Sequence, residues 1–298
     1  MSELRKKLNR NEQIWGYFFI GPQFIGLFIF ILVPVIQSLG ISFTSWDMLS
    51  PAVFSGLDNY KKILTDPLTW KVIENTFYYI AGFAILTLII SLLVALALSN
   101  NRIKGFIIFR SIYFLPNITS SVAISLIWLW LFNPDMGLIN IILGVFKIPA
   151  FGWYTTTEGA MPTIILMSVW QSIGYYMIIF LAGLNSISNT YYEAASIDGA
   201  GKIHCFFRIT LPLLTPTIFF VITMMLIGGF QVFNEMYMIT RGGPADATRS
   251  IVMQIYTSAF EYFRMGDASV LAWILFIIIF TITLIQFKFS NKWVNYDT

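Results

Sequence analysis

The chain alternates between long apolar stretches and short polar segments. Six stretches are long enough to cross a bilayer as a helix, which takes about 20 apolar residues. Glu235, near the end of the fifth, is the only acidic or basic residue in them. The predicted spans are residues 15–39, 77–98, 111–132, 162–184, 216–239 and 268–287. The pattern predicts an all-α, polytopic membrane protein with six transmembrane helices, organised as one transmembrane domain over residues 1–298.

One polar break, the loop of residues 186–215, differs from the other connections in its density of charge. It contains Glu193, Asp198, Lys202, His204 and Arg208 within sixteen positions. The sequence Asp198-Gly199-Ala200-Gly201 interrupts two short helical patterns, because glycine adopts the backbone angles that end a helix. Pro212 and Pro216 fit the first turn of the following span, where a missing N–H group costs little. We therefore expect a helix, a glycine elbow and a second helix on the membrane surface.

The distribution of basic residues predicts which side of the membrane each loop occupies. If the N-terminus is cytoplasmic, eleven Lys and Arg residues face the cytoplasm, including Arg102 and Lys104, and seven face outward. Cytoplasmic loops are enriched in Lys and Arg. The count therefore predicts that both termini and the loop 186–215 are cytoplasmic.

Composition excludes several classes of function. The chain is 57% hydrophobic and only 11% charged, against roughly 25% charged in an average soluble domain. Cys205 is the only cysteine and His204 the only histidine, so no disulfide within the chain and no metal site is expected. No basic tract interleaved with aromatic residues indicates nucleic-acid binding. We expect a membrane protein that is not an enzyme.

If a membrane protein of this kind is an active transporter, it needs a source of energy. Ion-coupled carriers place ionisable residues at membrane depth, and the interiors of the six predicted spans contain none. Gly201-Lys202 does not complete a phosphate-binding loop, because Ser196 stands at the position of the first glycine and Ile203 at that of the Ser or Thr. We therefore expect any coupling energy for transport to come from another chain.

Uncharged polar residues of the fourth and fifth spans are candidates for a substrate path. Ser168, Gln171, Ser172 and Tyr175 recur at helical spacing on one face. The candidate set is Ser168, Gln171, Ser172, Tyr175, Tyr176, Gly229 and Asn234. Hydroxyl, amide and aromatic groups suit a neutral polyhydroxylated ligand. Small and polar residues also line ordinary helix contacts in membranes, so helix packing is the alternative interpretation.

The spacing within the polar loop resembles the "EAA" signature of permease subunits of binding-protein-dependent ABC importers. The matching residues are Glu193, Ala194, Ala195, Asp198, Gly199, Ala200, Ile209, Leu211 and Pro212. Flanking segments, Gly242-Gly243-Pro244 and Met265-Gly266-Asp267-Ala268-Ser269, resemble the carbohydrate-uptake class and, within it, the MalF/UgpA-like sugar permeases.

The resemblance implies a transmembrane subunit of an ATP-driven importer in a bacterial plasma membrane, forming the path of a sugar or oligosaccharide. It implies a heterodimer with a second permease, two cytoplasmic ATPase subunits that bind ATP and magnesium, and an extracytoplasmic solute-binding protein. No cofactor is expected on this chain. The loop 186–215 would dock on an ATPase, with Glu193 in contact, Gly199 forming the elbow and Asp198 bracing the turn.

Two alternatives remain open at this point. Within the family, the substrate could be a sugar phosphate such as glycerol 3-phosphate, which should require a cation in the cavity. Outside the family, the chain could be a stand-alone ion-coupled carrier.

Overall fold

The computed structural model describes residues 2–99 and 105–295, apart from the side chains of residues 2–11 and 14. Helices dominate, and the strands of the described ranges form one short antiparallel pair, in which Thr44 faces Phe54 and Ser45 faces Val53. The chain forms two compact units. Unit 1 comprises Met1–Thr65 and Thr257–Trp273, and unit 2 comprises Asp66–Tyr256 and Ile274–Thr298.

Unit 1 is a long N-terminal helix followed by a small packed cap. Its elements are α1 (Ser2–Leu27), η1 (Phe28–Leu32), α2 (Val33–Ser42), β1 (Thr44–Ser45), β2 (Val53–Phe54), α3 (Asp58–Thr65), η3 (Thr257–Glu261) and the beginning of α15 (Met265–Ser290). Buried Asn59 holds the cap together by donating hydrogen bonds to the carbonyls of Ser42 and Thr44, each 2.9 Å long. Lys62 and buried Asp267 form an ion pair between α3 and α15.

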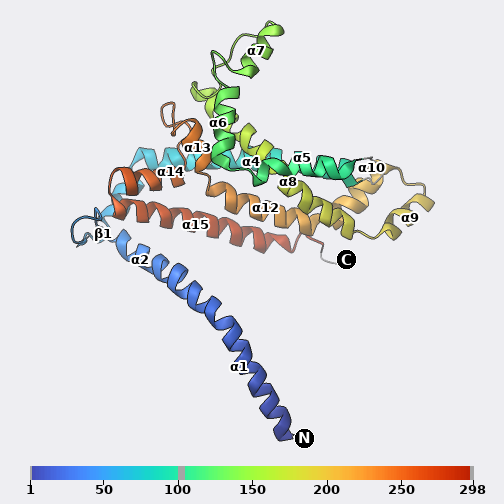
Figure 1. Ribbon diagram of the computed structural model, residues 1–298, viewed down its shortest axis with the longest axis horizontal. Coiled ribbons are helices and arrows are strands. Elements are labelled where there is room, and N and C mark those ends of the chain that lie inside the picture. Colours follow the sequence, from blue (N-terminus) through green and yellow to red (C-terminus); the bar gives the residue numbers. More distant parts are fainter. Residues whose placement is uncertain (1, 100–104, 296–298) are drawn as a thin grey trace. The chain divides into compact units, whose positions relative to one another are not determined.

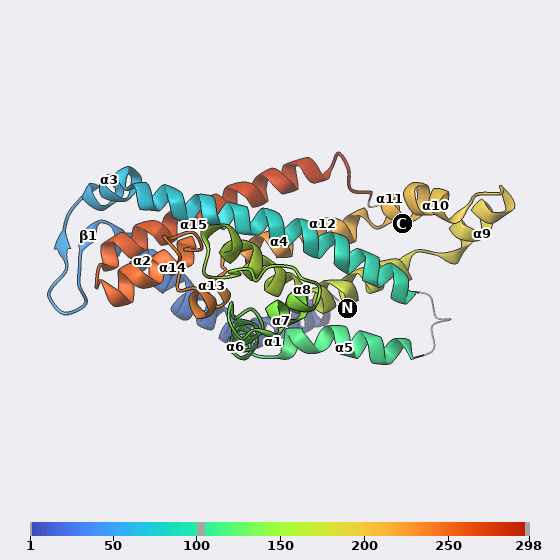
Figure 2. The same ribbon diagram turned by 90° about the horizontal axis from the view of Figure 1, so that it is seen from above.

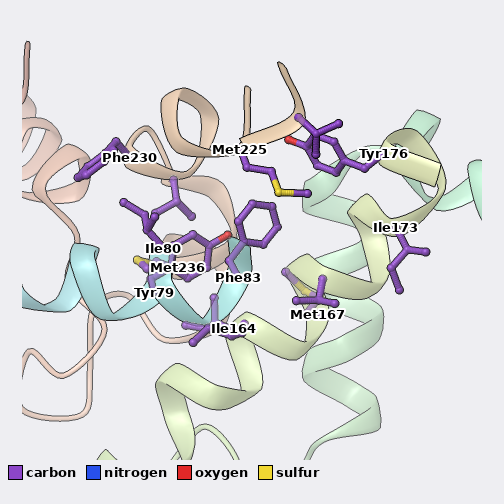
Figure 3. Packing of buried hydrophobic residues seen from close by; sticks show 14 of the residues in the cluster. Tyr79, Ile80, Phe83, Ile164, Met167, Ile173, Tyr176, Met225, Phe230 and Met236 are labelled. Carbon is purple, nitrogen blue, oxygen red and sulfur yellow. The ribbon is translucent and has the colours of Figure 1, made fainter. Parts of the chain in front are cut away.

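Unit 2 is a helical bundle that contains the main hydrophobic core. Its elements are α4 (Pro67–Ser99), α5 (Phe106–Ile118), α6 (Ser121–Leu131), α7 (Leu138–Val145), α8 (Thr157–Ser186), α9 (Asn189–Ile197), α10 (Lys202–Cys205), η2 (Phe206–Thr210), α11 (Leu211–Leu213), α12 (Thr215–Phe230), α13 (Asn234–Ile239), α14 (Ile251–Tyr256) and the rest of α15. The helices α4, α8 and α12 run alongside one another (Figure 2). Between them Phe83, Met167 and Met225 pack with other apolar side chains (Figure 3).

The expected all-α membrane architecture is confirmed, and the structure adds two bends. Among the described residues, four helices are long and apolar enough to cross a membrane unbroken: Trp15–Ser42, Pro67–Ser99, Thr157–Ser186 and Met265–Ser290. Two bent helix pairs are long and apolar enough when each pair is taken together, which brings the number to six if each pair is one span: Phe106–Ile118 with Ser121–Leu131, bent by 98°, and Lys202–Leu213 with Thr215–Phe230, bent by 63°. The third predicted span, 111–132, is therefore not one straight helix, because the backbone is extended at Thr119 and Ser120.

The predicted boundaries of two other spans also differ from the structure. The second helix begins at Pro67, ten residues before the predicted 77, because Asp66 caps it by accepting a 3.0 Å hydrogen bond from the Leu68 N–H. Proline is favourable at a first helical turn, where its missing N–H has no partner to lose. The helix of the fifth span ends at Phe230 rather than continuing to 239, and a short break separates it from α13.

Two prolines inside helices are accommodated by single π-helical turns. Just before Pro34, the N–H of Val33 bonds to the carbonyl of Phe28. In the same way, the N–H of Leu211 bonds to the carbonyl of Phe206 just before Pro212. Because proline lacks an N–H and its ring crowds the preceding turn, a widened turn lets the helix continue.

One end of unit 2 gathers the polar loop and the chain's last described residues. The helices α9 and α10 lie at this end, and α13 and α14 lie toward the other (Figures 1 and 2). Asn295 donates hydrogen bonds from its N–H to the Thr215 hydroxyl at 2.9 Å and from its amide to the Pro212 carbonyl at 3.3 Å. Arg102 and Lys104, counted toward the cytoplasmic side, lie outside the described residues.

The crossing of α5 and α8 depends on a glycine. A Cβ atom added at Gly174 would lie 1.9 Å from the carbonyl oxygen of Tyr113 and 2.7 Å from the Cα of Phe114. Small residues allow the backbones of membrane helices to approach this closely.

We predict that Gly174→Ala destabilises the fold, because the methyl group would meet backbone that cannot rotate away. Overpacking of this kind costs about 1–3 kcal/mol, and thermal unfolding of the purified protein would measure it. Gly144→Ala in α7 is the matched control, since a Cβ there meets nothing within 4 Å and alanine is the better helix former. Equal melting temperatures for the two variants would contradict this account of the helix crossing.

Candidate functional site

A cavity of about 380 Å³ lies inside unit 2, between α4, α8 and the ends of α5 and α12. Its walls are formed by Tyr79, Phe83, Asn117, Ser168, Gln171, Ser172, Tyr176, Gly228, Gly229, Gln231, Val232, Phe233, Asn234 and Glu235. The volume falls within the range of small-ligand sites, about 300–1,000 Å³.

The cavity lies where two spans depart from helical geometry. The α5 helix ends at Ile118 and the chain resumes as α6 at Ser121, while α12 ends at Phe230 and the chain resumes as α13 at Asn234. The two breaks meet, since the Asn234 amide donates a 3.2 Å hydrogen bond to the Ser121 hydroxyl. In a membrane, irregular backbone is tolerated only where protein buries it or a water-filled cavity solvates it. The two breaks therefore form part of the wall of the cavity.

Local sequence explains why the helices break at these points. Pro116 lies inside the last turn of α5, and Thr119 and Ser120 have extended backbone angles, with ψ of 145° and 127°. Gly228 and Gly229 lie in the last turn of α12, where glycine weakens the helix by about 1 kcal/mol relative to alanine.

The walls combine hydrogen-bonding groups with aromatic faces. Tyr79 and Phe83 stack with their ring centroids 5.6 Å apart and their planes at 4° (Figure 3). The buried Ser168 hydroxyl of α8 lies beside the Tyr79 hydroxyl of α4, so the two helices bring their polar groups together in the lining. The described lining contains one ionisable carboxyl group, on Glu235, and no Lys, Arg or His.

The structure brings together six of the seven candidate path residues. Ser168, Gln171, Ser172, Tyr176, Gly229 and Asn234 all line the cavity. Tyr175 does not. It lies beside the core and makes an edge-to-face contact with Tyr176, with ring centroids 5.1 Å apart.

Several lining residues were absent from the candidate set. Tyr79 and Phe83 come from α4, where their spacing of four residues inside an apolar run carried no distinguishing signal. Asn117 follows a proline in the middle of an apolar stretch, and that unusual pair was a usable signal. Glu235 was placed near the end of the fifth span and outside the candidate set, because the sequence did not show that α12 ends before it.

The second candidate site is the loop 186–215, which folds into an elbow of two helices joined by a glycine turn. Glu193, Ala194 and Ala195 lie in α9, which ends at Ile197 and is followed by Asp198 as its C-cap. Gly199 has a left-handed φ of +77°, its N–H bonds to Ser196 O at 3.1 Å, and the Ala200 N–H bonds to Ala195 O at 2.9 Å. These two bonds are the Schellman arrangement, which glycine permits at low cost.

The base of the elbow is closed by a second contact. The Tyr192 hydroxyl lies 2.9 Å from that of Thr210, which joins α9 to η2 before the chain enters Leu211 and Pro212. Ile209 lies in the same π-helical turn as Thr210. The elbow is thus held at both ends, at its tip by the glycine and at its base by this hydroxyl pair.

The outer surface of the elbow is apolar as well as charged. Ile197 is 87% exposed, Ile203 76% and Phe207 60%. The carboxylates of Glu193 and Asp198 form no ion pair with other described residues. Large apolar side chains exposed among charges are typical of a protein interface. The charged residues of this surface were predicted from the sequence, whereas the exposure of these three apolar side chains was not.

Comparison with known proteins identifies the family. The model of the family "Binding-protein-dependent transport system inner membrane component" matches residues 87–295. The chain is 42% identical to the probable ABC transporter permease protein YesP of Bacillus subtilis, over 97% of this chain and 94% of the relative. It is 34% identical to the multiple sugar-binding transport system permease protein MsmF of Streptococcus mutans, over 97% and 98%.

The fold is similar to that of solved transporters. A chain from the crystal structure of a bacterial ABC transporter involved in the import of the acidic polysaccharide alginate superimposes with a TM-score of 0.83, at 23% identity, over 97% of this chain and 99% of that one. With the family match covering most of the sequence and full-length relatives above 30% identity, the chain belongs to the family of inner membrane components of binding-protein-dependent transport systems.

Proposed function

We propose that this chain forms part of the translocation path of an ATP-driven sugar importer and is coupled to a separate ATPase through the loop 186–215. The observation that carries the proposal is the cavity at the meeting of two broken helices, lined by hydroxyl, amide and aromatic groups. Broken helices are where transporters commonly bind their substrates. As a member of a transport family, the chain is proposed to carry out no catalysis itself.

The chemistry of the cavity favours a neutral sugar or oligosaccharide. Amides and hydroxyls can exchange hydrogen bonds with sugar hydroxyls, and the stacked rings of Tyr79 and Phe83 offer a face for sugar C–H groups. The name of MsmF, a multiple sugar-binding system permease, is in keeping with this substrate class. A sugar phosphate such as glycerol 3-phosphate is disfavoured, because the described lining has no cation and carries Glu235.

The elbow supplies the attachment for the ATPase. Exposed Ile197, Ile203 and Phe207 provide apolar anchors, and Glu193 and Asp198 provide unpaired charge around them. Movement of a docked ATPase would pass through Thr210 and Pro212 directly into α12, whose far end borders the cavity. The ATPases, with their ATP and magnesium, face the cytoplasm in this arrangement.

The rest of the proposed assembly is the one typical of this family. The proposed complex contains a second permease, two ATPase subunits and an extracytoplasmic solute-binding protein. The elbow and Asn295, the last residue that the structure describes, lie at the same end of unit 2, which supports a cytoplasmic C-terminus. The excess of basic residues on that side supports the same orientation for the N-terminus.

One observation favours the stand-alone carrier as a second candidate. Glu235 lines the cavity, and ionisable groups at membrane depth are typical of ion-coupled carriers. Uptake in cells would separate the two functions. The carrier requires uptake that persists without the ATPase and collapses with an uncoupler at constant ATP.

We predict that Gly199→Val abolishes uptake while the protein still inserts in the membrane. A β-branched residue opposes the φ of +77° at this position, so the elbow cannot keep its docking shape. The measurements are sugar uptake in cells and co-purification of the ATPase subunits. Gly201→Val is the matched control, since Gly201 has φ of −75° and open space around it. Normal uptake and normal ATPase recovery with Gly199→Val would refute the coupling role.

We predict that Gln171→Ala weakens sugar binding without disturbing the fold. Loss of one hydrogen bond to a ligand costs about 1 kcal/mol, or roughly a fivefold rise in the sugar concentration at half-maximal uptake. Leu166→Ala on the same helix, 45% exposed and outside the cavity lining, is the control. An unchanged apparent affinity for Gln171→Ala would indicate that sugar is bound elsewhere.

A further inference from the structure

The break between α12 and α13 and the first turn of α13 together carry five lining residues, so their shape determines much of the cavity. These are Gln231, Val232, Phe233, Asn234 and Glu235. In the break, two backbone N–H groups are satisfied by tightened turns: Gln231 bonds to Gly228 O at 3.1 Å and Val232 to Gly229 O at 3.3 Å. The Val232 carbonyl accepts no backbone hydrogen bond from the described residues, since the bond at the start of α13 runs from the Tyr237 N–H to the Phe233 carbonyl.

A buried serine provides a donor for this carbonyl from a distant part of the chain. The Ser250 hydroxyl donates a 2.9 Å hydrogen bond to the Val232 carbonyl oxygen and accepts a 3.2 Å hydrogen bond from the N–H of Met253. Ser250 is completely buried. Its hydroxyl therefore links the first turn of α14 to the unwound segment. In a water-free site, losing this contact would leave both backbone groups without a partner, which is costly.

Ser250 itself belongs to a loop, residues 240–250, that is held rigid by its own hydrogen bonds. The hydroxyl groups of Thr240 and Thr248 lie 2.6 Å apart, and Thr248 also donates to the carbonyl of Gly243 at 2.8 Å. Arg241, Ala245 and Asp246 have left-handed φ angles of 50°, 49° and 58°. Non-glycine residues persist in that region only where the surroundings hold them. The loop is therefore held in a strained conformation by several hydrogen bonds and can act as a rigid support for Ser250.

The same loop is attached to α4, which forms the opposite wall of the cavity. The Asn75 amide donates to the carbonyls of Asp246 at 2.7 Å and Arg249 at 3.1 Å. The buried Thr76 hydroxyl accepts from the N–H of Ile251 at 3.1 Å. Asn75 and Thr76 lie one turn before Tyr79 on α4. The loop is therefore hydrogen-bonded both to α4, which forms one wall of the cavity, and to the break between α12 and α13.

Aromatic contacts reinforce this connection. Phe233, which lines the cavity, stacks on Tyr237 of α13 with ring centroids 5.2 Å apart, and approaches Tyr256 of α14 at 5.1 Å. Two independent contacts thus connect α14 to the break, one through the Ser250 hydroxyl and one through the Phe233 ring.

We propose that Ser250 is a positioning residue for the cavity: by holding the Val232 carbonyl, it sets the orientation of the lining side chains from Gln231 to Glu235. It does not line the cavity and makes no contact with the ligand. The consequence for substrate binding rests on the proposed function, but the effect on the geometry of the break does not.

The first experiment therefore needs no sugar. In a Cys205→Ser background, which removes the only native cysteine, Gln231→Cys places a thiol on the unwound segment. The protein is assembled in its complex in nanodiscs, and the rate of reaction with a small, charged, water-soluble thiol reagent is measured. Ser250→Ala should change this rate about fivefold, the change expected when one buried hydrogen bond is lost.

Two variants separate positioning from general loss of stability. Ser91→Ala removes an equally buried hydroxyl on α4 that bonds only within its own helix, and it should leave the rate unchanged. Ser250→Thr keeps the hydroxyl and should restore most of the wild-type rate. A rate unaffected by Ser250→Ala, or changed equally by Ser91→Ala, would overturn the proposal.

A second measurement connects the geometry to transport. In the complete complex with native Gln231, Ser250→Ala should raise the lactose or maltotriose concentration at half-maximal uptake about fivefold, whichever of the two is transported, with little change in maximal rate. A selective fall in maximal rate with unchanged affinity would overturn the role in ligand positioning. If the thiol rate changes and neither kinetic parameter moves, the positioning stands and the assignment of the cavity to sugar binding fails.

Discussion

The need to satisfy every backbone polar group in a water-free environment governs this structure. Most of the chain meets it with uninterrupted helices, as in α4, α8 and α15. Where a helix is interrupted, another hydrogen bond satisfies the backbone groups. A widened turn precedes Pro34 and Pro212, and Ser250 supplies a donor to the break after α12. Since unsatisfied groups are so costly in hydrocarbon, the places where helices stop are also the places where polar side chains collect.

The cavity and the elbow are connected by continuous helices. The α12 helix begins just beyond the elbow and ends at the cavity, and α8 extends from the Gly174 crossing beside the cavity to the loop that carries α9. Rigid helices of this kind transmit displacement over their whole length, whereas a mobile loop would absorb it. At the other end of unit 2, hydrogen bonds join the loop 240–250 both to α4 and to the break after α12. The break therefore cannot move far unless α4 moves with it.

Much of the fold was predictable from the sequence, for identifiable reasons. An apolar run of 20 or more residues has few alternatives to a membrane helix, and the spacing of Glu193, Gly199 and Pro212 identified both the elbow and the family. Boundaries were less predictable. The second span was predicted to begin at residue 77, although Pro67, with Asp66 before it, begins the helix ten residues earlier. Pro116 lies in a span that looked continuous, because hydropathy contains no information about the direction of the helix axis.

The sequence by itself determined the membrane class, the helical elbow and the polar character of the α8 face, since all three depend on residues close together in the chain. Tertiary structure alone decided that Tyr79, Asn117 and Glu235 share a cavity with that face and that Ser250 holds the carbonyl of Val232. These associations join residues that lie 18 to 97 positions apart in the chain. Such pairings depend on how helices bend and cross, which local patterns of polarity do not specify.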